Sequence, residues 1–260
     1  MRRELRGLTA RTLGKNALYL PEVDSTNRYL KEHGPLLPHG TVCFTGRQTA
    51  GRGRLGRGWD APDGETLAMS LLLRPAARTA LLAPVCGLAV SRALTALCGK
   101  KCGIKWPNDI VCGGRKVCGI LCEACWPDGE GFAVAGIGVN LLQTGEELRE
   151  AGLPHAASLR SLTGSAPGLE ETAAAILNEL EPLWLRLERE GFAALREEYE
   201  AACLTVGREV RVLFPDGAVR LEGRAVGIAE DGNLLIDHGG TVTAVNAGEV
   251  SVRGMAAYID

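Results

Sequence analysis

The sequence changes character near residue 207, and this change constrains the fold more than any other feature. Before it, segments with helical periodicity alternate with strand-like segments. After it, short strand-like runs are separated by Pro-Asp-Gly, Asp-Gly-Asn and Gly-Gly turns. We therefore expect an α+β domain over residues 1–205 and a small closed β-barrel over residues 206–260.

Apolar periodicity, capping residues and turn residues predict the elements of the first domain. Pro182 should kink or split a long helix, and the run Cys-Gly-Gly-Arg at residues 112–115 predicts a hairpin turn. Strands are expected over residues 16–23, 41–49, 66–74 and 132–142, and helices over residues 24–34, 78–98, 169–189 and 192–203.

Charge and hydropathy limit the classes of partner. The 260-residue chain has a formal net charge of -2, so no overall field attracts nucleic acid or an anionic membrane. The basic N-terminus has no continuous apolar run, and no later segment offers about 18 apolar residues free of glycine, proline and arginine. We therefore expect a cytoplasmic protein without membrane attachment.

Nine cysteines are scattered through apolar stretches. In a reducing compartment this odd number indicates free thiols packed like small hydrophobic side chains. A zinc site is the less favoured alternative, because the spacings are irregular and part of the set lies in a strand-like run. The central cysteines are Cys98, Cys102, Cys112, Cys118, Cys122 and Cys125.

The stretch GRGRLGRG (51–58) contains the letters G-x-G-x-x-G of a dinucleotide-binding turn. Trp59 and a run bearing proline and glycine follow it, and such a run cannot open the helix that a dinucleotide turn requires. A solvated loop and a single-strand nucleic-acid contact stay open. Glycine backbone donors, forked arginine side chains and Trp59 would together suit a clamp for a nucleotide or an acyl phosphate.

Five motifs occur in order along the chain: DSTN (24–27), RQTAGRGRLGRGW (47–59), KWPNDI (105–110), KVCGILCE (116–123) and GIGVNL (136–141). The set resembles the biotin protein ligases, and the C-terminal segment is similar to the SH3-like β-barrel of that family. The resemblance implies a class II synthetase-like mixed β-sheet flanked by helices. It also implies an enzyme that uses ATP to form biotinyl-5'-AMP and then transfers biotin to a lysine of a biotin carboxyl carrier protein.

The resemblance implies roles for particular residues. Lys116 would lie between the biotin carboxylate and the α-phosphate, whereas Asp109 could assist the acceptor lysine or form a structural ion pair with Lys105. The catalytic candidates are Lys116, Arg52 and Asp109. Biotin would contact Ser25, Thr26, Asn27, Gln48, Gly51, Arg52, Lys116 and Gly119. ATP, with Mg²⁺ bridging its phosphates, would contact Arg54, Arg57, Trp59, Lys116 and Asn140.

Two rival functions remain at this point: a lipoate or octanoate ligase of the same core fold, and a non-enzymatic protein that binds single-stranded nucleic acid. About fifteen residues precede the first strand, too few for a DNA-binding winged helix, so no DNA partner is expected. Family analogy suggests a homodimer through an exposed edge of the main sheet. The glycine-rich stretch is expected to be mobile without ligand and to order over biotin or the adenylate.

Overall fold

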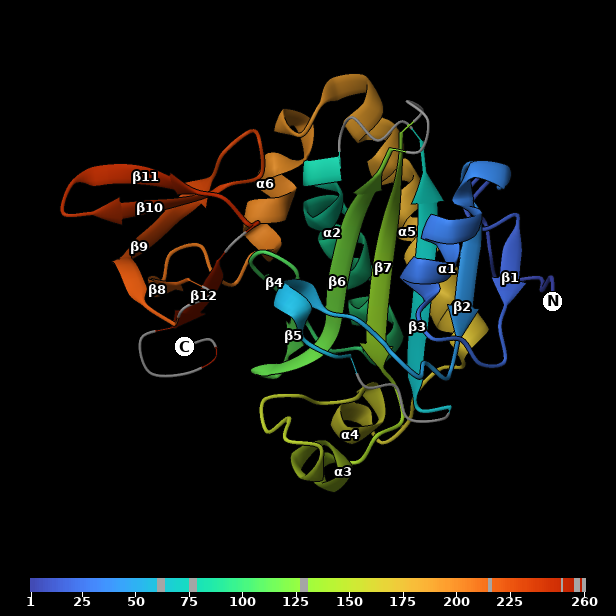
Figure 1. Cartoon of the computed structure of the whole chain (residues 1–260). Coiled ribbons are helices and arrows are strands. Elements are labelled where there is room, and N and C mark those ends of the chain that lie inside the picture. The colour runs from blue at the N-terminus through green and yellow to red at the C-terminus, as the bar shows by residue number, and fades with distance from the viewer. Residues whose placement is uncertain are drawn as a thin grey trace.

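The main body of the chain is a seven-stranded mixed sheet with helices on both faces (Figure 1). The computed structural model describes residues 1–59, 64–74, 79–126, 131–214, 217–248, 250–254 and 258. The strand order is β1-β2-β3-β7-β6-β5-β4; β1 and β2 run parallel, and the other neighbours are antiparallel. This architecture confirms the expected α+β fold with a mixed sheet.

The strands at the centre of the main sheet are longer than those at its edges. Because helices cover both faces, β3 and β7 are buried along nearly their whole length and read as continuous apolar runs. The strands are β1 (Ala17–Tyr19), β2 (Val42–Thr45), β3 (Thr66–Leu73), β4 (Cys102–Lys105), β5 (Asp109–Cys112), β6 (Arg115–Cys125) and β7 (Phe132–Asn140).

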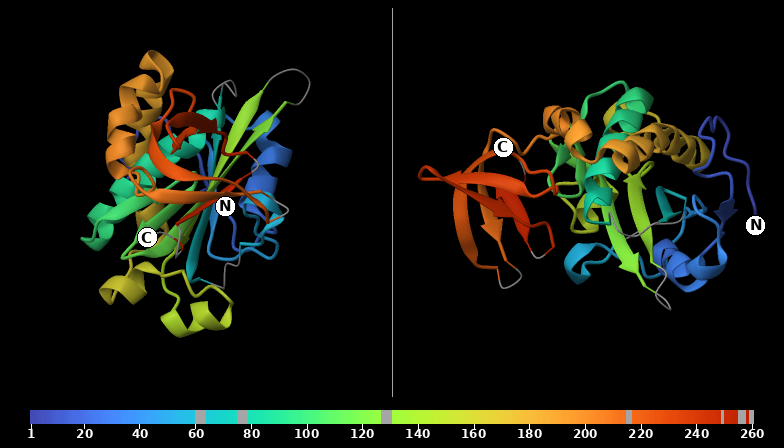
Figure 2. Two further views of the ribbon diagram at one scale, coloured as in Figure 1. Left: turned by 90° about the vertical axis from the view of Figure 1, so that its left-hand side faces the viewer. Right: turned by 90° about the horizontal axis from the view of Figure 1, so that it is seen from above.

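The helices divide between the two faces. One face is covered by α2 (Thr79–Cys98), α5 (Leu169–Glu190) and α6 (Ala193–Ala202), and α1 (Thr26–His33) packs on the other (Figure 2). The short helices α3 (Gly145–Glu150) and α4 (Leu159–Thr163) lie beyond one end of the sheet (Figure 1).

By length and composition, α2 is the one helix among the described residues that could cross a membrane. It contains Pro84, Gly87 and Arg92, and 61% of its most apolar window is buried inside the fold. It packs against both α5 and the sheet, which accounts for its apolar character as that of a core helix.

Several elements begin or turn where the capping and turn residues of the sequence predicted. Ser25 is the N-cap of α1 and accepts a hydrogen bond from the Arg28 backbone nitrogen. Gly113 and Gly114 both have positive φ, at 57° and 74°, and form the two-residue turn between β5 and β6. The helix predicted over residues 169–189 is observed as α5. The split that was one of two expected effects of Pro182 does not occur, because the burial of ten residues of α5 offsets the lost backbone hydrogen bond.

The C-terminal part forms a separate antiparallel sheet of five strands, which curves strongly in Figure 2. It has the SH3-like fold that the resemblance implied. The pairings among the described residues leave β11 and β12 at the two edges, so the expected closed barrel is not completed by strand pairing. The strands are β8 (Glu209–Leu213), β9 (Val219–Ile228), β10 (Leu234–His238), β11 (Thr241–Val245) and β12 (Ser251–Gly254).

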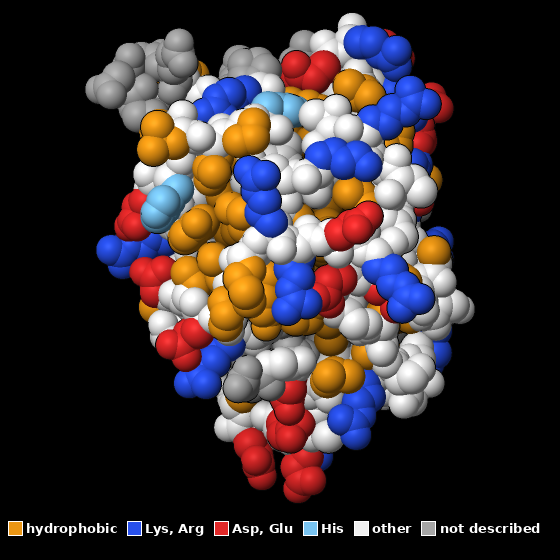
Figure 3. Space-filling view, turned by 90° about the vertical axis from the view of Figure 1, so that its right-hand side faces the viewer, with side chains coloured by type: hydrophobic (Ala, Val, Ile, Leu, Met, Phe, Trp, Pro, Cys, Tyr) orange, Lys and Arg blue, Asp and Glu red, His pale blue; other side chains and the backbone are white. Residues whose placement is uncertain are grey.

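Other segments of the chain pair with both outer strands of the main sheet. At β1, the Tyr19 backbone nitrogen donates to the Met1 carbonyl at 2.8 Å. At β4, the Leu204 nitrogen donates to the Ile104 carbonyl at 2.7 Å. Figure 3, which faces the β1 side, shows hydrophobic side chains near the centre with charged side chains around them. The exposed sheet edge proposed for a dimer is therefore already paired at these positions.

Candidate functional site

The five sequence motifs converge on one cavity of about 310 Å³. This volume falls at the lower end of the range of small-molecule sites, roughly 300–1,000 Å³. The walls come from the start of α1, the glycine-rich loop (residues 51–58), β5 to β7 and the C-terminal sheet. The predicted residues that line it are Ser25, Thr26, Asn27, Gln48, Arg52, Arg54, Arg57, Trp59, Asp109, Lys116, Gly119 and Asn140.

Gly51 lies outside this lining, at the base of the glycine-rich loop. Its carbonyl accepts a hydrogen bond from the Trp59 backbone nitrogen at 3.0 Å, which closes the loop as a small hairpin. A Cβ at Gly51 would collide with the Trp59 carbonyl. Gly51 therefore shapes the loop, and its contact with biotin stays a prediction.

One end of the cavity is a polar network built on buried side chains. The backbone nitrogen and Oγ1 of Thr26 both donate to Gln48 Oε1, at 2.8 and 3.1 Å. The Ser70 hydroxyl lies 2.7 Å from Thr26 Oγ1 and 2.6 Å from Asn27 Oδ1. Ser70 is fully buried on β3 and escaped the sequence analysis, although a lone serine in an apolar strand is a usable signal.

Asn27 is held from three directions at this polar end. Its Nδ2 donates to Glu123 Oε2 at 2.9 Å and to the Leu121 carbonyl at 3.2 Å. Burial alone would raise the pKa of Glu123, but hydrogen bonds from Lys31 and Asn27 hold the pKa of that carboxyl below its usual value. A Cβ at Gly136 would collide with Asn27 Oδ1, so glycine is required beside this amide.

Lys116 and Asp109 form an ion pair in the cavity wall. Lys116 Nζ lies 2.6 Å from Asp109 Oδ1, and the Tyr258 hydroxyl donates to Asp109 Oδ2. Burial alone would raise the pKa of Asp109, but the ammonium groups of Lys116 and Lys105 hold it below its usual value. Asp109 is therefore ionised at neutral pH, and the residue it pairs with directly is Lys116.

Lys105 was expected as a possible ion-pair partner of Asp109, but its ammonium group contacts the C-terminal part of the chain instead. It is 5% exposed, and its Nζ donates to the Val252 carbonyl at 2.8 Å. The same nitrogen lies 4.4 Å from the centre of the Tyr258 ring. Burial lowers the pKa of Lys105 to about 8. This lysine joins the main sheet to β12.

The Trp59 indole lies against the backbone of two glycines on neighbouring strands. A Cβ at Gly138 would come within 2.5 Å of its ring, and one at Gly119 within 2.8 Å. Lys116 Nζ lies 5.5 Å from the ring centre. Among the described residues, the buried indole Nε1 has no hydrogen-bond partner. The Trp59 ring is thus held on the sheet surface beside the Lys116–Asp109 ion pair, and its Nε1–H donor has no partner among the described residues.

The arginines of the glycine-rich loop differ in their surroundings. Arg54 donates to Asn108 Oδ1 at 3.0 Å, to the Val250 carbonyl at 3.2 Å and to the Ala247 carbonyl. It fastens the loop to the C-terminal sheet, whereas Arg52 and Arg57 are exposed at the cavity mouth. The loop joins β2 to β3, which confirms that it is not a dinucleotide-binding turn.

Further lining residues were missed by sequence reasoning. His155 and Tyr258 stack with ring centres 5.6 Å apart, and both lie at the cavity. No local pattern marks either residue, because only the fold brings Tyr258 to Asp109 and His155 to Tyr258. Asn140, which was predicted, lies at the end of β7 and donates to the Ala157 carbonyl at 3.2 Å.

Comparisons with known proteins agree with this site. Residues 19–140 match the Biotin/lipoate A/B protein ligase family, and residues 205–253 match the Biotin protein ligase C terminal domain. The Biotin--[acetyl-CoA-carboxylase] ligase of Mycobacterium tuberculosis is 37% identical over 81% of this chain and 78% of its own length. The Paracoccus denitrificans protein of the same name is 34% identical over 90% of this chain and 100% of its own length.

Solved structures give the same result. The biotin protein ligase from Aquifex aeolicus in complex with biotin and ATP aligns with a TM-score of 0.81 and 33% sequence identity. The alignment covers 92% of this chain and 99% of that one. The similarity therefore spans both sheets and includes the cavity between them.

Proposed function

The chain belongs to the biotin protein ligase family, and from this premise we propose that its cavity joins biotin to ATP and passes the biotinyl group to an acceptor lysine. It is a ligase whose small-molecule substrates are biotin and ATP. The observation that carries the proposal is the position of the Lys116–Asp109 pair, which shares one cavity with both the Thr26–Gln48 network and Trp59.

The polar end of the cavity suits the ureido ring of biotin. A buried urea must have its carbonyl and both N–H groups satisfied. Because Gln48 Oε1 accepts from Thr26, its amide nitrogen is the group that can donate to a ligand. Ser70 and Glu123 hold Thr26 and Asn27 in place through hydrogen bonds.

Lys116 supplies the charge that the first step needs. A biotin carboxylate oxygen attacks the α-phosphorus, a new P–O bond forms, and the bond to pyrophosphate breaks. The carboxylate and the phosphate are both anions, and the Lys116 ammonium can offset their repulsion as negative charge builds on the phosphate oxygens. Arg52 and Arg57 at the cavity mouth are placed to add to this field.

The lining residues do not form a protein cage for Mg²⁺. Asp109 is the one carboxylate in the described lining, and both its oxygens already contact Lys116 and Tyr258. We propose that any Mg²⁺ arrives with ATP and is held by phosphate oxygens and water, where it would neutralise charge on the triphosphate.

The nucleotide is proposed to lie on the Trp59 side. The indole offers a face on which adenine can stack, and Asn140 stands at the same wall. Since Arg54 is held by the C-terminal sheet, we assign the phosphate contact to Arg57 first, and a role of Arg54 toward ATP stays a prediction.

In the second step, the amine of an acceptor lysine attacks the biotinyl carbonyl and AMP leaves. The lowered pKa of Asp109 makes it a weak proton acceptor. We therefore propose that Asp109 orients Lys116 and is not the base. The acceptor is proposed to be a biotin carboxyl carrier protein, in line with the names of the relatives.

Product formation separates this function from its rivals. With the purified chain, ATP and Mg²⁺, we expect pyrophosphate release with biotin and none with lipoate. Release with lipoate alone would establish the lipoate ligase instead. Salt-dependent binding of single-stranded nucleic acid without either activity would establish the non-enzymatic alternative.

Several properties of the whole chain also stay predictions. We propose a cytoplasmic location, no DNA partner, and a division between catalytic and SH3-like parts at residues 205 and 206. A homodimer also stays a proposal, made by family analogy. Sedimentation of the chain with and without biotin and ATP measures its oligomeric state and tests the homodimer.

A further inference from the structure

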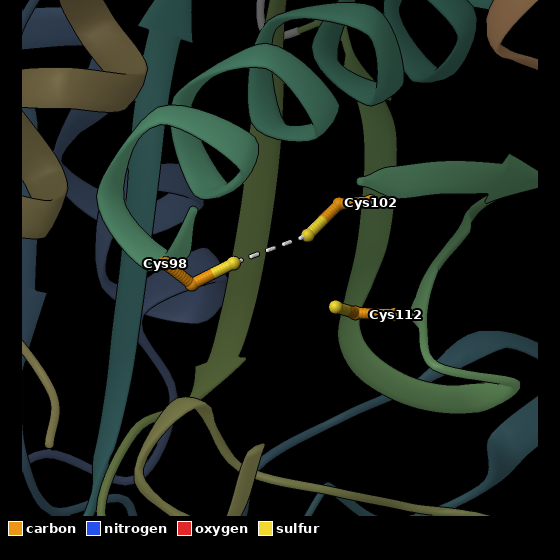
Figure 4. A group of neighbouring side chains, drawn as sticks. All are labelled: Cys98, Cys102 and Cys112. Atoms are coloured by element: carbon orange, nitrogen blue, oxygen red, sulfur yellow. Dashed lines mark hydrogen bonds between the residues drawn. The ribbon is translucent and has the colours of Figure 1, made fainter. Parts of the chain in front are cut away.

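Three cysteines that are separate in the sequence meet at the end of α2 (Figure 4). Cys98 is the last residue of α2, Cys102 the first of β4 and Cys112 the last of β5. Antiparallel pairing places Cys102 directly opposite Cys112. Gly99, with φ of +64°, lets the chain leave the helix and turn into β4, which brings Cys98 beside this pair.

The three sulfur atoms have the spacing of a metal-ligand set. Cys98 Sγ and Cys102 Sγ are 3.8 Å apart, and all three sulfurs lie within 4.8 Å of one another. In a tetrahedral site with zinc–sulfur bonds of about 2.3 Å, neighbouring sulfurs are about 3.8 Å apart. Side-chain adjustments of about 1 Å or less would complete this geometry. Figure 4 shows the three side chains pointing toward a common space.

The surroundings of the three thiols allow a cation to enter from solvent and to be held in a buried place. Cys102 and Cys112 are buried, at 2% and 1% exposure, whereas Cys98 is partly exposed and leaves a path to solvent. The positive charge of Lys100 lies near enough to stabilise a thiolate at Cys112.

We propose that Cys98, Cys102 and Cys112 bind a soft divalent cation of the zinc class through three thiolates, with the fourth position open to water on the Cys98 side. Binding displaces three S–H protons to the solvent and transfers no electrons. The complex has a net charge of −1, which Lys100 partly offsets. The irregular spacing of the cysteines in the sequence counted against a zinc site. The ligands are brought together by strand register, which the spacing does not reveal.

A metal at this site would stabilise the part of the fold that lies next to the cavity. It ties the end of α2 to the β4–β5 hairpin, and the far end of that hairpin carries Lys105 and Asp109. Metal binding should therefore stabilise the hairpin that positions these residues. The proposal does not depend on the ligase reaction, and it is tested without biotin or ATP.

Titration of the reduced full-length chain tests the site. Cobalt serves as the spectroscopic probe and zinc as the competitor. We expect one cobalt per chain with an intense thiolate-to-metal charge-transfer band, which one equivalent of zinc abolishes. Cys98→Ser, at the partly exposed ligand, should weaken binding by more than about 100-fold, since loss of even an outer contact costs about 10- to 100-fold. Cys125→Ser, a partly exposed cysteine on β6, is the matched control and should bind like the parent chain.

The titration would overturn the proposal if the parent chain gave no charge-transfer band, or if Cys98→Ser bound cobalt as tightly as the Cys125→Ser control. Thermal unfolding provides an independent readout, because a ligand that binds only the folded state raises its stability. Zinc should raise the unfolding midpoint of the parent chain and the Cys125→Ser variant and leave that of Cys98→Ser unchanged. Equal rises in all three would place the metal elsewhere.

Discussion

At the scale of single residues, two glycines on β7 divide the cavity into its two halves. Gly138 lies under the Trp59 ring, and Gly136 lies beside the Asn27 amide. Each gives room to a side chain that we assign to a different substrate. A methyl group at either position would therefore disturb one half of the site and spare the other.

Gly138→Ala should raise the KM for ATP by about tenfold, corresponding to about 1.4 kcal/mol, because the new methyl group pushes the indole off the sheet. Gly136→Ala should raise the KM for biotin by a similar factor and serves as the matched control. Steady-state kinetics with each substrate varied in turn gives both values. Equal effects on both substrates in both variants would show that the two halves are not separate.

At the scale of elements, the glycine-rich loop is a short hairpin anchored at one side. The Gly53 nitrogen donates to the Arg57 carbonyl at 2.7 Å, and Leu55 at the tip has a φ of 57°. Arg54 fastens the loop to the C-terminal sheet, while Arg52 and Arg57 remain exposed. A hairpin with a single anchor and four glycines has few contacts to keep it closed, which is typical of a segment that moves.

Biotin and ATP together should slow tryptic cleavage after Arg52 and Arg57 by about tenfold or more, because ligands that the loop covers reduce its local opening. The rate is read from the loss of intact chain by mass spectrometry. Cleavage after the exposed Lys101, in the turn before β4, is the internal control and should not change. A loop cut equally fast with and without ligands would refute the closure.

Sequence reasoning predicted most elements, and all but one of the predicted site residues line the cavity, because motifs on neighbouring strands carry the chemistry. It missed contacts that depend on tertiary packing. Tyr258 reaches Asp109 across the two sheets, and Ser70 joins Thr26 to Asn27 from inside an apolar strand. It also expected a kink or a split at Pro182 within the helix predicted over residues 169–189, since a local rule does not include the burial that holds α5 together.

At the scale of the whole molecule, two cations, one on β4 and one on the glycine-rich loop, connect the main domain to the C-terminal part. Lys105 donates to the Val252 carbonyl and Arg54 to the Val250 carbonyl. The folded state lowers the pKa of Lys105 to about 8, against 10.5 for an ordinary lysine. Between these two pH values the unfolded chain binds the proton and the folded chain does not, so stability rises with pH across this window.

Comparing the parent chain with Lys105→Met isolates the contribution of Lys105 to the pH dependence of stability. From pH 8 to 10.5 the parent chain should gain up to roughly 3 kcal/mol of unfolding free energy relative to the variant, because the cost of burying the charged ammonium disappears. Urea unfolding at each pH measures it, with Lys101→Met as the exposed control. A stability difference between the parent and Lys105→Met that stays constant with pH would contradict the buried-lysine interpretation.

The central claim is that Lys116 supplies the charge for joining biotin to ATP. The most direct measurement is the rate at which the chain forms biotinyl-5'-AMP from biotin, ATP and Mg²⁺, followed by mass. We expect the parent chain to form the adenylate and Lys116→Ala to form it at least about 100-fold more slowly, with circular dichroism showing that the variant is folded. A folded Lys116→Ala variant that forms the adenylate at the parent rate would contradict the account.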